Sequence, residues 1–513
     1  MLAMSGAEIV NLILALSGKE TVLLILVLVF GFFMAWNIGA NDVANAMGTS
    51  VGSKALTLKK AVVLAAVFEF LGAYLVGGNV ADTVRKGIFN PIDLTIIYPA
   101  PGEAALILAC GMIAALMAAG TWLMIASYFG WPVSTTHSIV GAVVGFGCVA
   151  MGTNYIAWSK VSFIFVGWVV SPLLSGAVAY LLFRLILQQV FFRSDPVRAA
   201  KRIAPYLVFL VLIVLIGVVT FKGLKPFWKQ HHIDPFDTQP LIIMCGISLF
   251  LGLAGLFFMR HIVRNIKSGQ DEGDQDEVYS NATVSRGLTK ATMHLRRVRD
   301  AAIGPINERA VALLEELEQL HGEIREKVQY GTNSQDLQKV ERIFVFLQIL
   351  TACFVAFSHG SNDVANAIGP LSGAFHAVMK GEVVMQSGVQ GWALALGGIG
   401  IVLGLATWGW RVIRTVGERI TELTPSRGFC AEFAAAITIL TASVLPIGLP
   451  ISTTHTLVGA VLGVGLARGI GALNLATMRD IVASWLITIP MGAVLSIVFY
   501  LLVKTFVLDL GLF

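Results

Sequence analysis

Residues 39–48 read Gly-Ala-Asn-Asp-Val-Ala-Asn-Ala-Met-Gly, and residues 360–369 read Gly-Ser-Asn-Asp-Val-Ala-Asn-Ala-Ile-Gly. A second string also occurs twice, as Pro-Val-Ser-Thr-Thr-His at 132–137 and Pro-Ile-Ser-Thr-Thr-His at 450–455. The first pair lies 321 residues apart and the second 318, so both strings belong to one duplicated unit. We call them the Asn-Asp motifs and the Ser-Thr-Thr-His motifs.

The rest of the chain is strongly apolar. Of its 513 residues, 56% are hydrophobic and 13% are charged, against about 25% charged in a soluble domain. A water-exposed surface on a chain of this length would need more charged residues. Most of the chain is therefore predicted to face lipid. The net charge of +5 is too mild to indicate a nucleic-acid partner. The five cysteines lie in apolar stretches without a Cys/His cluster, which predicts buried thiols.

A helix that crosses a bilayer needs about 20 mostly apolar residues, and these segments are apolar on all sides, unlike barrel strands. The sequence therefore predicts an all-α integral membrane protein with about 12 transmembrane segments. The segments are 21–39, 61–80, 104–129, 134–151, 158–183, 205–221, 239–259, 343–360, 388–410, 429–447, 452–468 and 480–503.

The two Asn-Asp motifs follow the first and the eighth of these segments. An odd number of crossings separates them, so the two copies are predicted to run in opposite directions through the membrane. Inverted-topology repeats are typical of secondary transporters, which bind their substrates near mid-membrane between the halves. The predicted fold thus has two inverted repeats, with helix breaks or half-helices at the binding loops.

The distribution of basic residues predicts the orientation. Lys and Arg are more frequent in alternate short loops, most clearly at Arg184, Arg193, Arg198, Lys201 and Arg202. By the positive-inside rule these loops are cytoplasmic, which places both termini outside the cytoplasm. The predicted domains are an N-terminal membrane portion (1–259, the first repeat and two further spans), a cytoplasmic hydrophilic loop (260–342, partly helical) and a C-terminal membrane portion (343–513, the second repeat).

The central loop opens with an acidic run at 271–277. It later carries Leu313, Leu317, Leu320 and Ile324 at spacings of three or four, which predicts an amphipathic helix or helical hairpin. The loop is either a solvated connector or a regulatory domain.

The Asn-Asp motifs carry candidate cation ligands. In the first copy, Asn41, Asp42 and Asn45 lie where a span ends, flanked by Gly39 and Gly48, which are expected to break the helix. Ionisable groups within a membrane normally mark a pathway or a paired site. Asp42 and Asn45 are three residues apart and share a helical face, where their oxygens could bind a small cation. Alternatively, Asp42 caps the next helix.

The Ser-Thr-Thr-His motifs carry candidate anion ligands. Proline disfavours helix in the preceding residue, and Ser or Thr caps the first free N–H groups of a helix. A helix N-terminus suits an anion such as phosphate, and three hydroxyls in each copy supply further donors. Capping alone would need only one hydroxyl. His137 and His455 are interpreted as ligands, proton carriers or oriented structural groups.

The two sets of ligands conflict unless a cation is present. An anion should not bind beside Asp42 and Asp363 in a poorly hydrated site, because like charges repel strongly there. Bound Na⁺, or protonation, would remove this repulsion. We therefore hypothesise that cation and anion bind interdependently and that this coupling drives symport.

The paired motifs resemble the signatures of the inorganic phosphate transporter (PiT) family, and the resemblance covers both membrane halves. It implies a homodimeric, multi-pass phosphate symporter in the cell membrane, with a site formed by both repeats. The implied Na⁺ ligands are Asp42, Asn45, Asp363 and Asn366. The implied phosphate contacts are Asn41, Asp42, Ser134, Thr135, Thr136, Asn362, Asp363, Ser452, Thr453 and Thr454.

Two intramembrane glutamates, Glu69 and Glu432, resemble acids that the family needs for transport. Each is interpreted as a coupling residue or as a structural acid satisfied by a neighbour. The repeat offset places Gln390, and not Glu432, opposite Glu69. Both Asn-Asp motifs resemble the sodium-coupled branch, whereas the proton-coupled branch often carries His-Asp in the first copy. H⁺-coupled uptake of phosphate or sulfate is the alternative.

Two other classes of protein agree less well with the sequence. An intramembrane hydrolase could use Ser134 or Ser452, but a nucleophile need not be duplicated and no Gly-x-Ser-x-Gly elbow occurs. A passive anion channel has less need for buried acids. The sequence thus predicts a transporter without catalytic residues, with Na⁺ as coupling ion and no other cofactor.

Overall fold

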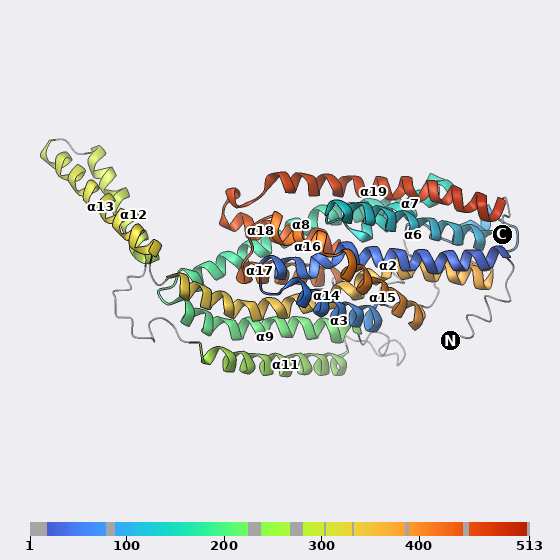
Figure 1. Ribbon diagram of the computed structural model, residues 1–513, viewed down its shortest axis with the longest axis horizontal. Helices are drawn as coiled ribbons and strands as arrows, with labels where there is room; N and C mark the ends of the chain where they lie inside the picture. Colours follow the sequence, from blue (N-terminus) through green and yellow to red (C-terminus); the bar gives the residue numbers. More distant parts are fainter. Residues whose placement is uncertain are drawn as a thin grey trace. The chain divides into compact units, whose positions relative to one another are not determined.

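The computed structural model describes residues 18–77, 88–223, 237–266, 281–301, 304–330, 333–384, 389–444 and 451–509 (Figure 1). Every regular element in these ranges is a helix, as predicted. The long helices are α2 (Gly18–Gly52), α3 (Leu58–Val76), α6 (Glu103–Phe129), α7 (Thr135–Ala150), α8 (Trp158–Ile186), α9 (Pro196–Gly223), α11 (Thr238–Arg264), α12 (Asn281–Ala301), α13 (Pro305–Tyr330), α14 (Asn333–Lys380), α15 (Gly391–Trp408), α17 (Pro425–Val444), α18 (Thr453–Arg468) and α19 (Leu475–Val503).

Short helical segments connect or extend these helices. Two are α-helical, α5 (Asp93–Ile97) and α16 (Trp410–Arg414). The others are 3₁₀ turns at Thr153–Tyr155 and Ile470–Ala472 and π-helical turns at Leu187–Phe191, Thr415–Arg419 and Lys504–Asp509.

Within the described residues, each of the twelve predicted membrane segments coincides with a long helix, and the last residues of segment 388–410 reach into α16. Eight of the described helices are long and apolar enough to cross a membrane, and α7 is a shorter apolar helix. Helices α3, α17 and α18 cover the three remaining segments. The predicted fold class is therefore confirmed.

The contacts divide the chain into two compact units. One comprises 1–181, 214–248 and 348–513, and the other 182–213 and 249–347. Helices α12 and α13 of the second unit form a hairpin (Figure 1), so the central loop is partly helical. The acidic run at 271–277 lies outside the described residues.

The buried face of α13 differs from the predicted one. Leu313 and Leu320 are 48% and 44% exposed, whereas Ala310 and Leu314 are buried. The spacing of apolar residues indicated a helix correctly, but packing against α12 selects a face that is rotated by one position.

The first unit shows the predicted breaks at the Ser-Thr-Thr-His motifs. Helix α6 ends at Phe129, where Gly130 takes a left-handed conformation with φ of 71°. Helix α7 then begins at Thr135, and α18 begins at the equivalent Thr453. Each of these two helices, which we call half-helices, has 16 residues, fewer than the about 20 that cross a bilayer.

The prediction of a break at the Asn-Asp motifs is wrong. Helix α2 continues for 35 residues through the first motif, and α14 continues through the second. Gly39 serves close packing instead, because a Cβ there would overlap the backbone of Ile401 in α15. Gly48 likewise lies against Val416. No backbone carbonyls are freed at these points, so ligands must come from side chains.

Helices of the two repeats are interleaved in pairs of equivalent contacts. Gly39 lies against the backbone of Ile401, and its repeat mate Gly360 lies against that of Glu69. In the same way Gly141 of α7 lies against Ile489 of α19, and Gly459 of α18 against Pro172 of α8. Each half-helix is thus packed on the last helix of the other repeat.

These contacts also correct the expected partner of Glu69. Because Gly39 and Gly360 are mates, Ile401 and not Gln390 is the residue equivalent to Glu69. The connection after α14 is longer than that after α2, so the repeat offset changes between the motif and the next helix.

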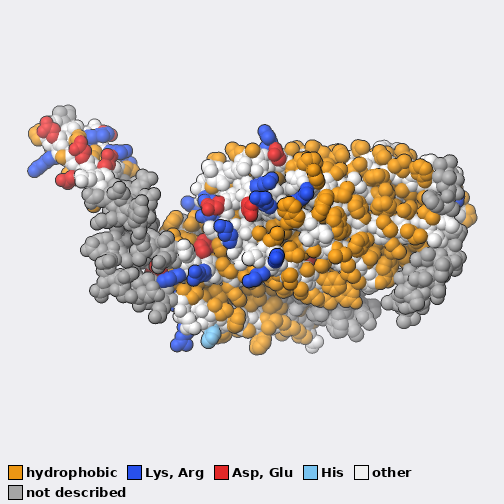
Figure 2. All heavy atoms as spheres, in the orientation of Figure 1, with side chains coloured by type: hydrophobic (Ala, Val, Ile, Leu, Met, Phe, Trp, Pro, Cys, Tyr) orange, Lys and Arg blue, Asp and Glu red, His pale blue; other side chains and the backbone are white. Residues whose placement is uncertain are grey.

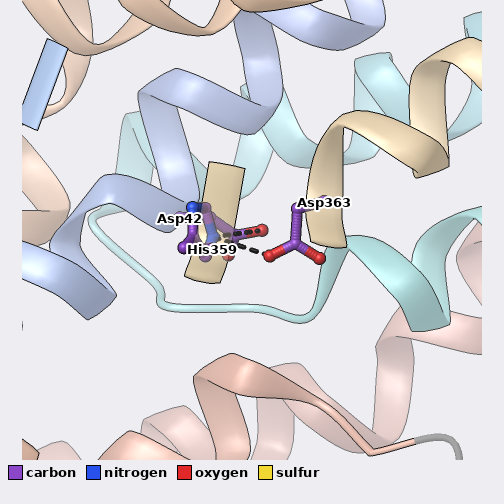
Figure 3. A group of neighbouring side chains, drawn as sticks. All are labelled: Asp42, His359 and Asp363. Atoms are coloured by element: carbon purple, nitrogen blue, oxygen red, sulfur yellow. Dashed lines mark ion pairs between the residues drawn. The ribbon is translucent and has the colours of Figure 1, made fainter. Parts of the chain in front are cut away.

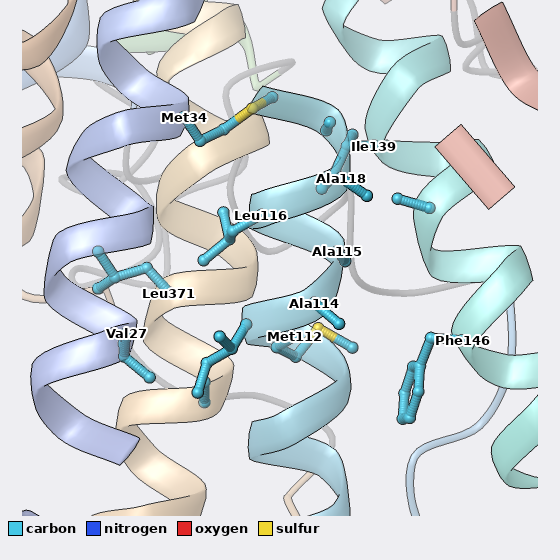
Figure 4. Close-up of a cluster of buried hydrophobic side chains, with 14 of the residues drawn as sticks. Val27, Met34, Met112, Ala114, Ala115, Leu116, Ala118, Ile139, Phe146 and Leu371 are labelled. Carbon is cyan, nitrogen blue, oxygen red and sulfur yellow. The ribbon is translucent and has the colours of Figure 1, made fainter. Parts of the chain in front are cut away.

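The core of the first unit is made of small and branched side chains. Val27 and Met34 of α2, Leu371 of α14 and Phe146 of α7 surround the alanine-rich face of α6 (Figure 4). The outside is apolar as well, and hydrophobic side chains cover a broad continuous area in Figure 2. Leu173, for example, is 67% exposed. A surface of this kind is stable in contact with lipid.

Candidate functional site

Helices α2 and α14 bring the two Asn-Asp motifs together in antiparallel orientation. Gly31 of α2 lies against Leu371 of α14, and Asp42, further along α2, faces His359, an earlier residue of α14. The acid and the second asparagine of each motif are buried, namely Asp42 and Asn45 in α2 and Asp363 and Asn366 in α14. The inverted repeat therefore places two acidic half-sites next to each other.

The first half-site is completed by the second repeat. Asn45 Nδ2 donates to Asp42 Oδ1 at 3.1 Å and to Thr454 Oγ1 at 2.8 Å. Thr454 Oγ1 in turn donates toward Asp42 Oδ1 at 3.0 Å. A carboxylate, an amide and a hydroxyl thus converge within hydrogen-bond distance, and all three are buried.

The second half-site takes threonine hydroxyls from both repeats. Asn366 Nδ2 lies 3.1 Å from Asp363 Oδ1, 3.1 Å from Thr135 Oγ1 and 3.2 Å from Thr136 Oγ1. Thr453 Oγ1 donates to Asp363 Oδ2 at 3.2 Å. The structure therefore brings together the predicted cation ligands and the four threonine hydroxyls.

The serines of the Ser-Thr-Thr-His motifs cap the half-helices. Ser134 Oγ accepts the backbone N–H of His137 at 3.3 Å, and Ser452 Oγ accepts that of His455 at 3.1 Å. This is the N-cap role expected of a single hydroxyl. The threonines that follow each serine do not cap the helix. Their hydroxyls contact the acidic half-sites instead.

Asn41 holds the loop that precedes α7. Its Nδ2 donates to Ser127 Oγ and to Trp131 O, both at 3.0 Å, and its Oδ1 accepts Val133 N–H at 3.1 Å. Every hydrogen-bonding atom of this amide contacts protein. The second-repeat equivalent, Asn362, is half-buried. Their roles as phosphate contacts remain predictions.

His359 is a site residue that the sequence analysis missed. It lies one helical turn before Asp363, and its Nε2 is 2.7 Å from Asp363 Oδ2 and 3.8 Å from Asp42 Oδ2 (Figure 3). Its Nδ1 is 3.3 Å from Glu69 Oε1 on α3. The available signal was an ionisable residue inside an apolar span, four positions from a motif acid.

Asp42, His359 and Asp363 each offer a ligand atom, and these atoms lie within 4.8 Å of one another. Carboxylate oxygens suit hard cations, whereas imidazole suits transition metals. Together with Glu69, the cluster holds three carboxyl groups and one imidazole in a buried place. Burying this much negative charge requires cations or protons as partners.

Glu432 occupies a separate polar pocket. It accepts hydrogen bonds from Ser50 Oγ at 3.0 Å, from Thr351 Oγ1 at 2.5 Å and from the Thr49 hydroxyl. All four side chains are buried. The carboxyl is thus satisfied by neighbours, as one of its two predicted interpretations requires.

Neither glutamate environment is repeated. The repeat mates of Ser50 and Glu432 are Leu371 and Ala114, which belong to the hydrophobic core in Figure 4. The mates of Glu69 and His359 are Ile401 and Ile38. The acidic half-sites are therefore symmetric, while the polar groups around them are not.

The motif histidines face each other and lie against two tryptophans. The rings of His137 and His455 have centroids 4.8 Å apart, and they lie against Trp168 and Trp485 at 4.2 and 3.8 Å. Their ring nitrogens make no hydrogen bond within the described ranges. Of their three predicted roles, oriented structural groups matches these surroundings best.

Comparison with known proteins places these features in one family. The profile of the phosphate transporter family matches residues 38–496. A provisionally named phosphate permease of Chlamydia pneumoniae is 44% identical over 476 residues, which cover 93% of this chain and 97% of the relative. The chloroplastic inorganic phosphate transporter 2-1 of Arabidopsis thaliana is 42% identical, with 92% of this chain and 70% of the relative covered.

A solved structure agrees with the sequence relatives. It is described as the sodium-dependent phosphate transporter, shares 36% sequence identity and has a TM-score of 0.68, with 94% of this chain and 99% of that chain covered. The match extends over both repeats and all four motifs, and on this evidence the chain belongs to the phosphate transporter family.

Proposed function

We propose that this chain is a secondary active symporter that imports inorganic phosphate together with Na⁺ across the cell membrane. One observation supports this proposal most strongly. Two half-helices begin next to two acidic half-sites. Hydroxyls of each repeat reach the motif amide of the other repeat, and the Thr454 hydroxyl also reaches Asp42. Anion and cation ligands are therefore supplied by the same few residues.

The half-helix N-termini are suited to phosphate. In each, the Ser hydroxyl and a backbone carbonyl satisfy the third and fourth N–H groups. The N–H groups of Thr135 and Thr136, and of Thr453 and Thr454, make no hydrogen bond to the described part of the chain. Buried helix ends with unpaired N–H groups favour an anion.

The acidic half-sites are suited to Na⁺. Asp42 with Asn45, and Asp363 with Asn366, present carboxylate and amide oxygens, and threonine hydroxyls complete each set. Hard oxygen ligands of this type bind small cations. The solved relative is described as sodium-dependent, which supports Na⁺ as the coupling ion. Bound cations would neutralise the carboxylates that otherwise repel phosphate.

Proton coupling is the second candidate, and His359 is the observation that favours it. Both ring nitrogens face carboxyl oxygens, at 2.7 and 3.3 Å. Each contact is attractive only if a hydrogen lies between the two atoms, so the His359–Glu69–Asp363 cluster must hold dissociable protons. H⁺-coupled transport of phosphate or sulfate would use this cluster in place of Na⁺.

Two non-carrier classes fit less well. A hydrolase needs a hydrogen bond between nucleophile and base, whereas the Ser134 and Ser452 hydroxyls bind backbone N–H groups of their own helices. A passive channel would give no counterflow, because only a carrier exchanges labelled substrate against a gradient.

The decisive experiment is uptake of labelled phosphate into proteoliposomes with Na⁺ and pH gradients imposed independently. Uptake driven by an inward Na⁺ gradient at equal pH and inhibited by arsenate is expected. Uptake that follows only the pH gradient would replace Na⁺ by H⁺, and uptake without dependence on either gradient would reject symport.

A further inference from the structure

The loop that leads into α7 is held by side chains from three other helices. Asn41 of α2 binds Trp131 O and Val133 N–H, as described above. Thr454 Oγ1 of α18 lies 3.3 Å from Val133 O. The intervening carbonyl, Pro132 O, accepts a hydrogen bond of 2.9 Å from the indole Nε1 of Trp485 in α19. Three consecutive residues are therefore fixed through their backbone, immediately before the Ser134 cap.

The same indole also contacts the second half-helix. The rings of Trp485 and His455 are stacked, with centroids 3.8 Å apart and an interplanar angle of 19°. His455 is in the first turn of α18, and its N–H is the one that Ser452 caps. Trp485 is thus a single side chain that touches the first turn of one anion-binding helix and the loop before the other.

The symmetry-related tryptophan makes only one of these contacts. Trp168 of α8 is the repeat mate of Trp485 and lies against His137 at 4.2 Å. Its buried indole N–H has no hydrogen-bond partner among the described residues. The four rings of Trp168, His137, His455 and Trp485 form a row across the two half-helices, and the N–H bond to a loop carbonyl is seen at the Trp485 end.

We propose that Trp485 is a positioning residue for phosphate, and that it ties the two anion-binding helix starts together. The proposal rests on the phosphate site proposed above. The indole N–H fixes the position of the Pro132 carbonyl oxygen. It thereby fixes the direction in which the Thr135 and Thr136 N–H groups point. The ring holds His455 and thereby the start of α18. Trp485 itself need not touch the anion.

The test is Trp485→Phe, assayed by phosphate uptake into proteoliposomes. Phenylalanine keeps an aromatic ring against His455 and removes the N–H donor. Loss of one buried hydrogen bond that orients the loop is expected to raise the phosphate KM about fivefold, while Vmax and the Na⁺ concentration for half-maximal uptake stay within about twofold.

A matched control is available on the same helix face. Trp122 Nε1 of α6 donates to Thr488 Oγ1 at 3.1 Å. Thr488 lies on α19, one turn after Trp485. Trp122→Phe removes the same kind of buried indole hydrogen bond but keeps the contacts of Trp485 with Pro132 and His455. We expect folded yield to fall similarly in both variants, judged by size-exclusion chromatography, and the phosphate KM to rise only in Trp485→Phe.

The outcomes separate this inference from the proposed function. An unchanged phosphate KM in Trp485→Phe, or an equal rise in both variants, would overturn the positioning role while wild-type uptake still supports symport. Failure of the wild-type protein to take up phosphate would reject the proposed function instead. If Trp485→Phe does not fold, Trp485→Tyr keeps a ring and displaces the donor, and the same rise in KM is expected.

Discussion

At the scale of single residues, the acidic half-sites are the costly feature of this protein. Asp42 and Asp363 are 0% and 1% exposed in a helical core. Each carboxylate nevertheless has an amide from its own helix and a threonine hydroxyl of α18 as partners. Groups of this kind are retained in membrane proteins when they bind ions or substrates.

Replacing either carboxylate should abolish coupling without unfolding the protein. In Asp42→Asn and Asp363→Asn the neutral amide is easier to bury and can still bond the threonines, whereas the charge that attracts a cation is gone. We expect Na⁺-driven phosphate uptake to fall at least about tenfold with an unchanged melting temperature. Retention of wild-type Na⁺ dependence in both variants would remove these acids from the cation sites.

Thr454 should matter for Na⁺ as well as for phosphate. Its hydroxyl contacts both Asp42 and Asn45, so Thr454→Val deletes one oxygen of the first half-site and leaves a buried carboxylate with fewer partners. We expect the Na⁺ concentration for half-maximal uptake to rise by about tenfold, measured by uptake at saturating phosphate.

Thr456→Val is the matched control for Thr454→Val. Thr456 is buried two residues further along α18, and its hydroxyl donates to Ser452 O at 2.7 Å instead of to a carboxylate. This variant should lose about 1 kcal/mol of stability and keep its Na⁺ dependence. Equal shifts of Na⁺ dependence in both variants would mean that Thr454 acts through packing alone.

At the scale of elements, close helix crossings hold the half-sites together. Helix α2 meets α15 where Gly39 lies against Ile401 and Gly404 against Trp36, and α3 meets α14 where Gly72 lies against Phe357 and Gly360 against Glu69. Small residues let membrane helices approach closely, and packing is the main force between them. The crossings therefore set the depth at which Asp42 and Asp363 meet.

Gly39→Ala should separate α2 from α15. The added Cβ would overlap the Ile401 carbonyl, which is backbone and cannot turn away, so the helices must move apart at a cost of about 1–3 kcal/mol. Gly391→Ala in α15 is the control, because a Cβ there meets nothing within 4 Å. Thermal unfolding in detergent should show a lower midpoint for Gly39→Ala alone. Equal midpoints would show that α2 and α15 are free to shift.

At the scale of the whole molecule, symport requires that the two substrates help each other to bind. Phosphate should bind at least about fivefold more tightly in Na⁺ than in choline at the same pH, and Na⁺ should bind more tightly by the same factor when phosphate is present. Isothermal titration of the purified protein in both orders measures this. Phosphate affinity independent of both Na⁺ and pH would refute the mechanism.

Other whole-molecule features remain predictions. These are the homodimer, the extracytoplasmic position of both termini and the cytoplasmic position of the central loop. The family assignment implies a membrane location, and the apolar exterior of the described helices agrees with it (Figure 2).

Much of the site could be predicted because its signals are local in sequence. The duplicated motifs identified Asp42, Asp363 and the threonines, and the predicted segments located the starts of α7 and α18 to within one residue. His359 was missed because a lone histidine in an apolar span has no local pattern, and its importance depends on Glu69 in another helix. Gly39 was misread as a helix breaker because a glycine that breaks a helix and one that packs a helix look alike in sequence.

Hydropathy, capping and repetition are properties of short segments, so the twelve apolar segments, the duplication and the chemical types of the candidate ligands could be predicted from the sequence alone. The folded structure was needed to show that Thr454 contacts Asp42 and Thr135 contacts Asn366, that Ile401 and not Gln390 is equivalent to Glu69, and that Trp485 contacts both the loop before α7 and the first turn of α18. These pairings join residues far apart in the chain, and their geometry depends on how closely the glycines allow the helices of the two repeats to cross.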